Sequence, residues 1–135
     1  MTGMRAELRR GRLAAEIVVA YLRARRELRR APIETVVERL RERGPAVGTQ
    51  PAEGLREARN LGYAVGKAVR FLPGDTRCLR RSLVLLQLLA RRGISAELVI
   101  GTRTEPDFLA HAWVEHEGQP VLPPGDDSFG RLVAL

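Results

Sequence analysis

Residues 75–93, DTRCLRRSLVLLQLLARRG, decide how the chain folds. Leucine and valine run from Leu83 to Leu89 with only Gln87 between them, and the stretch is shorter than the roughly 20 apolar residues that a bilayer span needs. A helix that is apolar on nearly every side is typical of the centre of a domain. We therefore predict a buried central helix over residues 78–92 that ends at Gly93.

Three more helices are predicted before this central helix, because apolar residues recur there at intervals of three and four. We expect them over residues 4–30, from Pro32 to the Gly44-Pro45 stop, and over residues 52–72. Proline suits a first helical position, since its missing N–H would have no partner there. In the first helix the expected apolar stripe consists of Leu8, Ile17, Val18, Tyr21, Leu22 and Leu28, with arginine over much of the remaining surface.

The apolar period changes after Gly93 from that of a helix to that of a strand. Ala96, Leu98 and Ile100 alternate with Glu97, Val99 and Gly101. Residues 109–122 are typical of two strands joined by a turn at Glu117-Gly118. Residues 129–135, FGRLVAL, fit a last strand. Helices followed by a small antiparallel sheet make an α+β domain.

Composition excludes several classes of function. The chain has 135 residues, enough for one domain with its own core, and a net charge of +7 that predicts attraction to an acidic partner. An aromatic content of 4% argues against a stacking surface for nucleic acid. One cysteine and two histidines leave no internal disulfide and little scope for a metal, so we expect no cofactor. Glu16 interrupts the apolar stretch that a signal peptide needs, which favours a cytoplasmic protein without a membrane segment.

Cys78 stands at the predicted start of the central helix, directly after Arg77. Unpaired backbone N–H groups and the positive end of the helix dipole stabilise a thiolate at such a position, and the same N–H groups suit an oxyanion. The alternative is that Cys78 is a small buried hydrophobic residue.

His111 lies in the predicted strand LAHAWVEH, 109–116. Strand alternation places His111, Trp113 and Glu115 on one face, and Ala112 and Val114 on the other. An imidazole delivered to the start of the central helix would take a proton from the Cys78 thiol and return it to a leaving amine. The alternative is a structural role for His111. We expect His116, near the turn, to be a solvated surface residue.

The segments CLRRSLVLLQLLARRGISAELVIGTR, 78–103, and FLAHAWVEHEGQPV, 108–121, resemble the transglutaminase-like leader peptidases of lasso-peptide maturation. The resemblance covers about residues 61–122 and implies a papain- or transglutaminase-like core in which a central helix packs on a small antiparallel sheet. It implies that Cys78 is the nucleophile and His111 the base of a bacterial cysteine protease. The substrate would be a precursor leader peptide, and an ATP-dependent macrolactam cyclase would act on the product.

The chain departs from that family at the third catalytic residue, because Pro123 occupies the position where the family commonly has an aspartate. Asp126 and Asp127 follow within a few residues, and either would accept a hydrogen bond from the His111 ring. The alternatives are that both aspartates belong to a solvated turn, or that a backbone carbonyl or a side-chain amide completes a Cys-His dyad.

The predicted organisation has two parts. Residues 1–50 form an N-terminal helical region whose arginine face is a candidate docking surface, and residues 51–135 form the peptidase core. In relatives that carry a fused recognition module, the module is a winged helix-turn-helix, whereas the N-terminal part of this chain is predicted to be helical throughout. We therefore expect a separate leader-recognition protein. An arginine face that is merely solvated is the alternative.

Two rival functions stay open on the sequence alone. The same Cys-His pair serves acyl transfer to an amine, as in transglutaminases and arylamine acetyltransferases. A non-catalytic basic module that binds nucleic acid or an acidic protein would use neither residue.

Overall fold

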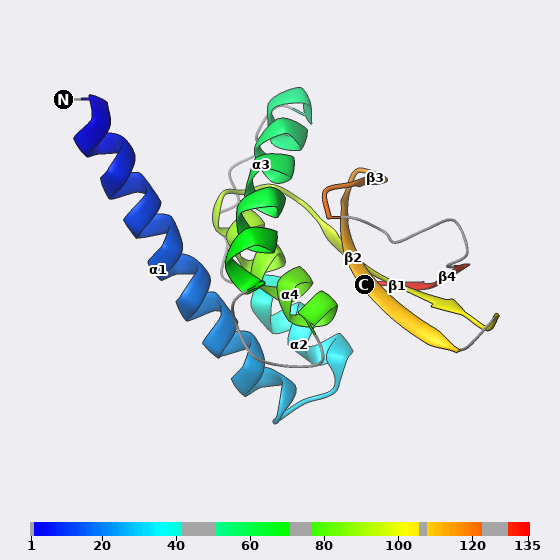
Figure 1. Ribbon diagram of the computed structural model, residues 1–135. Helices are drawn as coiled ribbons and strands as arrows, with labels where there is room; N and C mark the ends of the chain where they lie inside the picture. Colours follow the sequence, from blue (N-terminus) through cyan, green and yellow to red (C-terminus); the bar gives the residue numbers. More distant parts are fainter. Residues whose placement is uncertain (1, 42–50, 71–76, 106–107, 123–129) are drawn as a thin grey trace.

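A computed structural model describes residues 2–41, 51–70, 77–105, 108–122 and 130–135. Four helices precede four strands along the chain, and the helices lie on one side of the sheet (Figure 1). The elements are α1 (Thr2–Leu28), α2 (Ile33–Arg41), α3 (Pro51–Val69), α4 (Arg77–Arg91), β1 (Glu97–Arg103), β2 (Leu109–His116), β3 (Gln119–Pro120) and β4 (Gly130–Ala134). The predicted α+β class and the predicted order of elements are confirmed.

Helix α4 is the centre of the core, as its sequence predicts. Every residue from Ser82 to Leu89 is buried, and α1, α2, α3, β1 and β2 all contact this helix. The one polar interruption, Gln87, donates a hydrogen bond from Nε2 to the Ala20 carbonyl of α1 at 2.8 Å. That bond satisfies the buried amide and also ties α1 to the centre.

Helix α4 ends where the sequence predicts, at Gly93. This glycine has a φ of 72°, the left-handed conformation that residues with a Cβ rarely adopt. The Ile94 N–H reaches back to the Leu89 carbonyl at 2.9 Å, which is the long bond of a Schellman cap. The chain is thereby turned from the helix towards β1.

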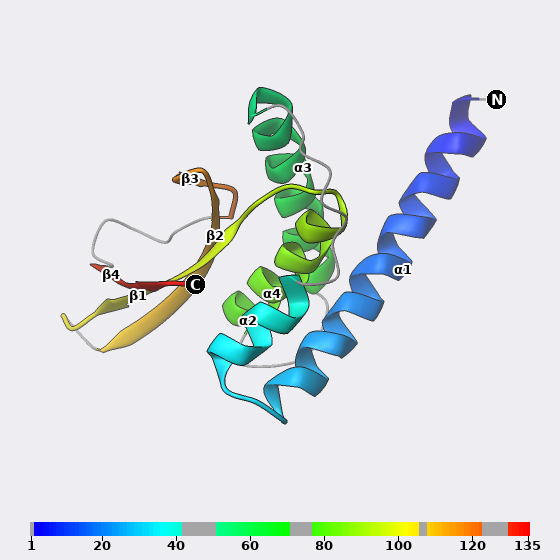
Figure 2. The same ribbon diagram turned by 180° about the vertical axis from the view of Figure 1, so that it is seen from behind.

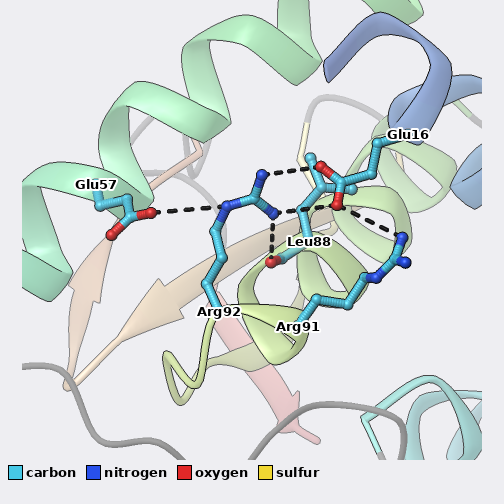
Figure 3. A network of polar contacts seen from close by, with 5 residues as sticks. All are labelled: Glu16, Glu57, Leu88, Arg91 and Arg92. Atoms are coloured by element: carbon cyan, nitrogen blue, oxygen red, sulfur yellow. Dashed lines mark hydrogen bonds and ion pairs between the residues drawn. The ribbon is translucent and has the colours of Figure 1, made fainter. Parts of the chain in front are cut away.

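A polar network joins three helices near the end of α4 (Figure 3). The Arg92 guanidinium lies 2.8 Å from Glu16 Oε1 of α1 and 3.6 Å from Glu57 Oε1 of α3, and it donates to the Leu88 carbonyl at 2.9 Å. Arg91 makes a second ion pair with Glu16 at 3.5 Å. The network fixes the middle of α1 against the α4 helix end.

The predicted apolar stripe of α1 is correct only in part. Of its expected apolar stripe, Ile17 and Tyr21 are buried, whereas Leu8, Val18 and Leu22 are 66%, 48% and 54% exposed. The predicted stripe combined residues that lie on two different sides of the helix, and only one of these sides packs against the core.

Helices α2 and α3 each bury one apolar side, as the predicted intervals of three and four residues indicate. Val36, Val37 and Leu40 of α2 are buried, and the Val36 N–H donates to the Pro32 carbonyl at the helix start. Arg41 at the end of α2 donates to the Ala96 and Leu135 carbonyls, which ties α2 to the sheet. The α3 stripe is buried at Ala58, Leu61, Val65 and Val69, and the predicted end at residue 72 lies outside the described residues.

The sheet has the strand order β3-β2-β1-β4 and is antiparallel throughout. Glu117 and Gly118, with φ of 50° and 81°, form the tight turn between β2 and β3 that the sequence predicts. The predicted last strand is β4, which pairs with the free side of β1. In the described part of the chain, none of the helices has the length and apolar character that a membrane span requires.

Candidate active site

Cys78 is the second residue of α4, so its predicted position at the head of the buried helix is confirmed. The cysteine is free and half-buried, and it packs against the edge of the core. Its carbonyl accepts a hydrogen bond from Ser82 Oγ at 2.7 Å, one turn further along. The first N–H groups of any α-helix have no partner inside the helix, and Cys78 lies in that first turn, at the positive end of the helix dipole.

His111 lies in a row of alternate residues on β2. Its ring stacks on the Trp113 ring, with centroids 5.8 Å apart and planes inclined by 25°. Trp113 Nε1 in turn donates to Glu115 Oε2 at 2.8 Å. These contacts confirm the predicted alternation, because they join residues two positions apart on the same face of the strand.

Arg131 of β4 completes this row, and no local sequence pattern indicated it. Its Nη2 lies 2.8 Å and 2.9 Å from the two Glu115 carboxylate oxygens. The Glu115 side chain is only 7% exposed, so the guanidinium and the indole N–H supply the polar contacts that a buried carboxylate needs. The network therefore holds the Trp113 ring, and with it the stacking surface of His111, in one orientation.

Gly101 of β1 makes room for the Trp113 ring. It lies opposite His111 in the strand register, and a Cβ placed on it would meet the Trp113 ring carbons at 2.8 Å. That separation is well inside van der Waals contact. The Trp113 ring therefore occupies the space beside residue 101 only because that residue has no side chain.

The strand directions put the Cys78 and His111 elements at the same end of the structure. The chain leaves the end of α4 and returns to the sheet along β1 in the opposite direction, and β2 is antiparallel to β1 (Figure 1). The beginnings of α4 and β2 therefore lie towards one end, while the far end brings Ser95, after α4, against His116. A hydrogen bond between the Cys78 thiol and the His111 imidazole stays a prediction.

The candidates for the third catalytic residue, Asp126 and Asp127, lie outside the described residues, as does Pro123. Their roles stay predictions. Among the residues that the structure describes, no group of three or more His, Cys, Asp or Glu side chains is placed to hold a metal ion.

The prediction for His116 is wrong. Its side chain is buried, with 5% of the residue exposed, and Nδ1 donates a hydrogen bond to the Ser95 carbonyl. A position beside a turn suggests exposure, but the segment between α4 and β1 covers this end of β2. Of the two histidines, His111 is therefore the more accessible and His116 the structural one.

These features define an α+β protein in which the only thiol heads a buried helix and an imidazole lies on the sheet that packs against it. A profile described as the transglutaminase-like superfamily matches residues 4–134, and the chain belongs to this family. The match includes α1 and α2 as well as the core that carries Cys78 and His111.

One curated relative is similar over part of its length. The chain is 50% identical over 44 residues to the microcin J25-processing protein McjB of Escherichia coli. The matched segment spans 33% of this chain and 21% of that protein. The comparison with solved structures gave no match.

Proposed function

We propose that the chain is a cysteine peptidase that removes the leader from a lasso-peptide precursor. The observation that carries the proposal is the single thiol at the head of buried α4 in a transglutaminase-like chain, with His111 on the neighbouring strand at the same end. The partial similarity to a protein named for processing microcin J25 supports this substrate class. We expect the peptidase to act in the cytoplasm, where precursor peptides are made.

The proposed chemistry is acyl transfer to water. The Cys78 sulfur attacks the scissile carbonyl carbon while His111 takes the thiol proton, and backbone N–H groups of the first turn of α4 stabilise the oxyanion. Collapse of the tetrahedral intermediate breaks the C–N bond, and His111 returns the proton to the leaving amine. Water then attacks the thioester, which releases the leader carboxylate and regenerates the thiol.

The row on β2 orients the base in this mechanism. Stacking on Trp113 limits the ring orientations of His111, and the Glu115–Arg131 pair holds the tryptophan. Asp126 or Asp127 is the proposed acceptor for the second ring N–H of His111, which would fix its tautomer. Separate Asp126→Ala and Asp127→Ala variants test this role, and a dyad is the account if neither slows cleavage.

The proposal includes partners. A separate recognition protein would hold the leader, and the amine exposed by cleavage would be the substrate of an ATP-dependent macrolactam cyclase. Residues 1–50 would carry the docking surface and residues 51–135 the peptidase core.

The decisive test compares two matched pairs of variants in a leader-cleavage assay with mass-spectrometric detection. Cys78→Ala should abolish cleavage with an unchanged circular dichroism spectrum, whereas Ser82→Ala, one turn further along the same helix, should retain it. His111→Gln should lower the rate by at least about a hundredfold, the usual contribution of a general base. His116→Gln should keep the rate per folded molecule. Full processing by the Cys78→Ala protein would refute the proposal.

A second candidate function follows from the family itself. Transglutaminase-like chemistry shares the acyl-enzyme and differs only in the acceptor, so an amine would replace water in the last step. The mass of the leader product separates the two functions, since hydrolysis adds water and aminolysis adds the amine.

A further inference from the structure

Helix α1 carries two apolar stripes on opposite sides. The inner stripe packs into the core and consists of Leu13, Ile17, Ala20, Tyr21 and Ala24. The second, which we call the outer stripe, recurs at intervals of three and four and consists of Met4, Leu8, Gly11, Ala15, Val18 and Leu22. Inner and outer residues such as Ile17 and Ala15 are two positions apart, which is about 200° around a helix of 3.6 residues per turn.

The outer stripe has no partner among the described elements. Its large members are 48% to 66% exposed: Met4, Leu8, Val18 and Leu22. In both views α1 lies at the edge of the molecule, and its N-terminal half extends away from the other helices (Figures 1 and 2). Residues 3–12 are exposed on every side, and a Cβ added to Gly11 would meet nothing within 4 Å. A surface helix ordinarily has one apolar stripe, so a second, continuous one marks an interaction surface.

Charge around the outer stripe limits what can cover it. Exposed arginines border it, Arg5 and Arg12 on one side and Arg25 on the other. Two of the three glutamates of α1 already serve other elements, because Glu16 pairs with Arg92 and Glu27 pairs with Arg39. Glu7 is the acidic residue that remains, so the named arginines outnumber the acidic residues and the border of the stripe has a net positive charge.

A positive border disfavours a second copy of this chain as the occupant. Two outer stripes packed together in antiparallel fashion would bring Arg5 and Arg12 of one copy against the same side of the other. Like charges at that spacing repel, and each copy also brings a net charge of +7. A partner surface with apolar residues flanked by carboxylates would pack on the stripe and pair with the arginines at its border.

We propose that the outer stripe of α1 docks a protein partner through an apolar helix bordered by aspartate and glutamate. Helix-to-helix recognition of this kind places apolar anchors at intervals of three and four, with charged pairs at the edges. The inference rests on the proposed function in one respect: the partner would be the protein that holds the leader. The docking chemistry itself is independent of whether Cys78 acts as a nucleophile.

The test is a binding titration with two synthetic peptides of about four heptads, each with leucine at the a and d positions. One carries glutamate at the e and g positions, and the other carries lysine there. The full chain with Cys78→Ala is titrated against each labelled peptide by fluorescence anisotropy. We expect the glutamate peptide to bind at least about tenfold more tightly than the lysine peptide, and its affinity to fall as salt is raised.

Variants locate the binding surface. Leu8→Glu combined with Val18→Glu changes only exposed positions and should weaken binding of the glutamate peptide at least about tenfold. Tyr63→Glu, at an equally exposed apolar residue of α3, is the matched control and should bind as the parent does. Equal binding of both peptides, or no effect of the double variant, would overturn the proposal.

Two further measurements cover the other occupants. Light scattering that shows a concentration-dependent dimer, lost in the double variant, would assign the stripe to a second copy. Cosedimentation with vesicles that contain phosphatidylglycerol, lost in the same variant, would assign it to a lipid surface. Either result would overturn the proposal.

The outcome is separable from that of the proposed function. If Cys78→Ala abolishes leader cleavage and the glutamate peptide does not bind, the peptidase proposal is supported and the docking proposal is refuted. If the peptide binds at the outer stripe and the Cys78→Ala protein cleaves the leader fully, the docking proposal is supported and the peptidase proposal is refuted.

Discussion

Helices α1 and α4 are both rich in leucine, valine and arginine, yet the structure uses them in opposite ways. Helix α4 is surrounded, and every residue from Ser82 to Leu89 is buried. Helix α1 meets the core on one side only, and its residues 3–12 are exposed throughout. Apolar residues on several sides of a helix therefore mean complete burial in one case and an unpartnered face in the other. The two helices differ in burial because they have different numbers of neighbouring elements, and that number cannot be predicted from the sequence of the helix alone.

Truncating matched leucines in the two helices should give the largest difference. Leu85 of α4 is fully buried, so Leu85→Ala should lower the free energy of unfolding by about 2 to 5 kcal/mol through lost burial and the cavity left behind. Leu22→Ala, on the outer stripe of α1, should change it by about 0.5 kcal/mol or less. Urea unfolding monitored by circular dichroism measures both. Equal costs would mean that the outer stripe is covered in the free protein.

Adding a methyl group at matched glycines should give opposite signs. A Cβ at Gly101 would meet the Trp113 ring at 2.8 Å, so Gly101→Ala should destabilise the protein by about 1 to 3 kcal/mol and disturb the His111 stacking. Gly11→Ala in α1 places its methyl group in open space and should stabilise the helix by up to about 1 kcal/mol. Thermal unfolding of the two variants gives the signs directly. A stabilising Gly101→Ala would contradict the placement of the tryptophan.

Neutralising matched glutamates should give the smallest difference in stability. Glu115→Gln keeps the size of the buried side chain but removes the charge that binds Arg131, and we expect a loss of about 1 to 2 kcal/mol together with slower leader cleavage. Glu7→Gln on exposed α1 should alter neither quantity. Unfolding and cleavage rates of the two proteins are to be compared at the same pH. Unchanged cleavage by Glu115→Gln would separate this network from the proposed base.

Much of the fold follows from local sequence because local signals are strong here. Gly93 ends α4 with a positive φ, and Glu117-Gly118 forms the turn between β2 and β3, as glycine at such positions predicts. The alternation of His111, Trp113 and Glu115 is also correct, since the period of a strand needs no knowledge of its neighbours.

The candidate site was accessible to sequence analysis only in part. Cys78 heads α4 as predicted, because helix starts have local signals. Arg131 was missed because it reaches Glu115 from β4, and no local pattern indicates which strand lies beside which. The burial of His116 was missed for a similar reason, since Ser95 reaches it from a distant segment.

The sequence by itself determined the types of the elements, their order and the ends that glycine marks, because these depend on backbone preferences and apolar periods within a few residues. Only the tertiary structure decided which side of α1 is buried, which strand β4 joins and which histidine is enclosed. Those outcomes depend on contacts between residues far apart in the chain, and such contacts exist only in the folded protein, where the other elements pack around α4.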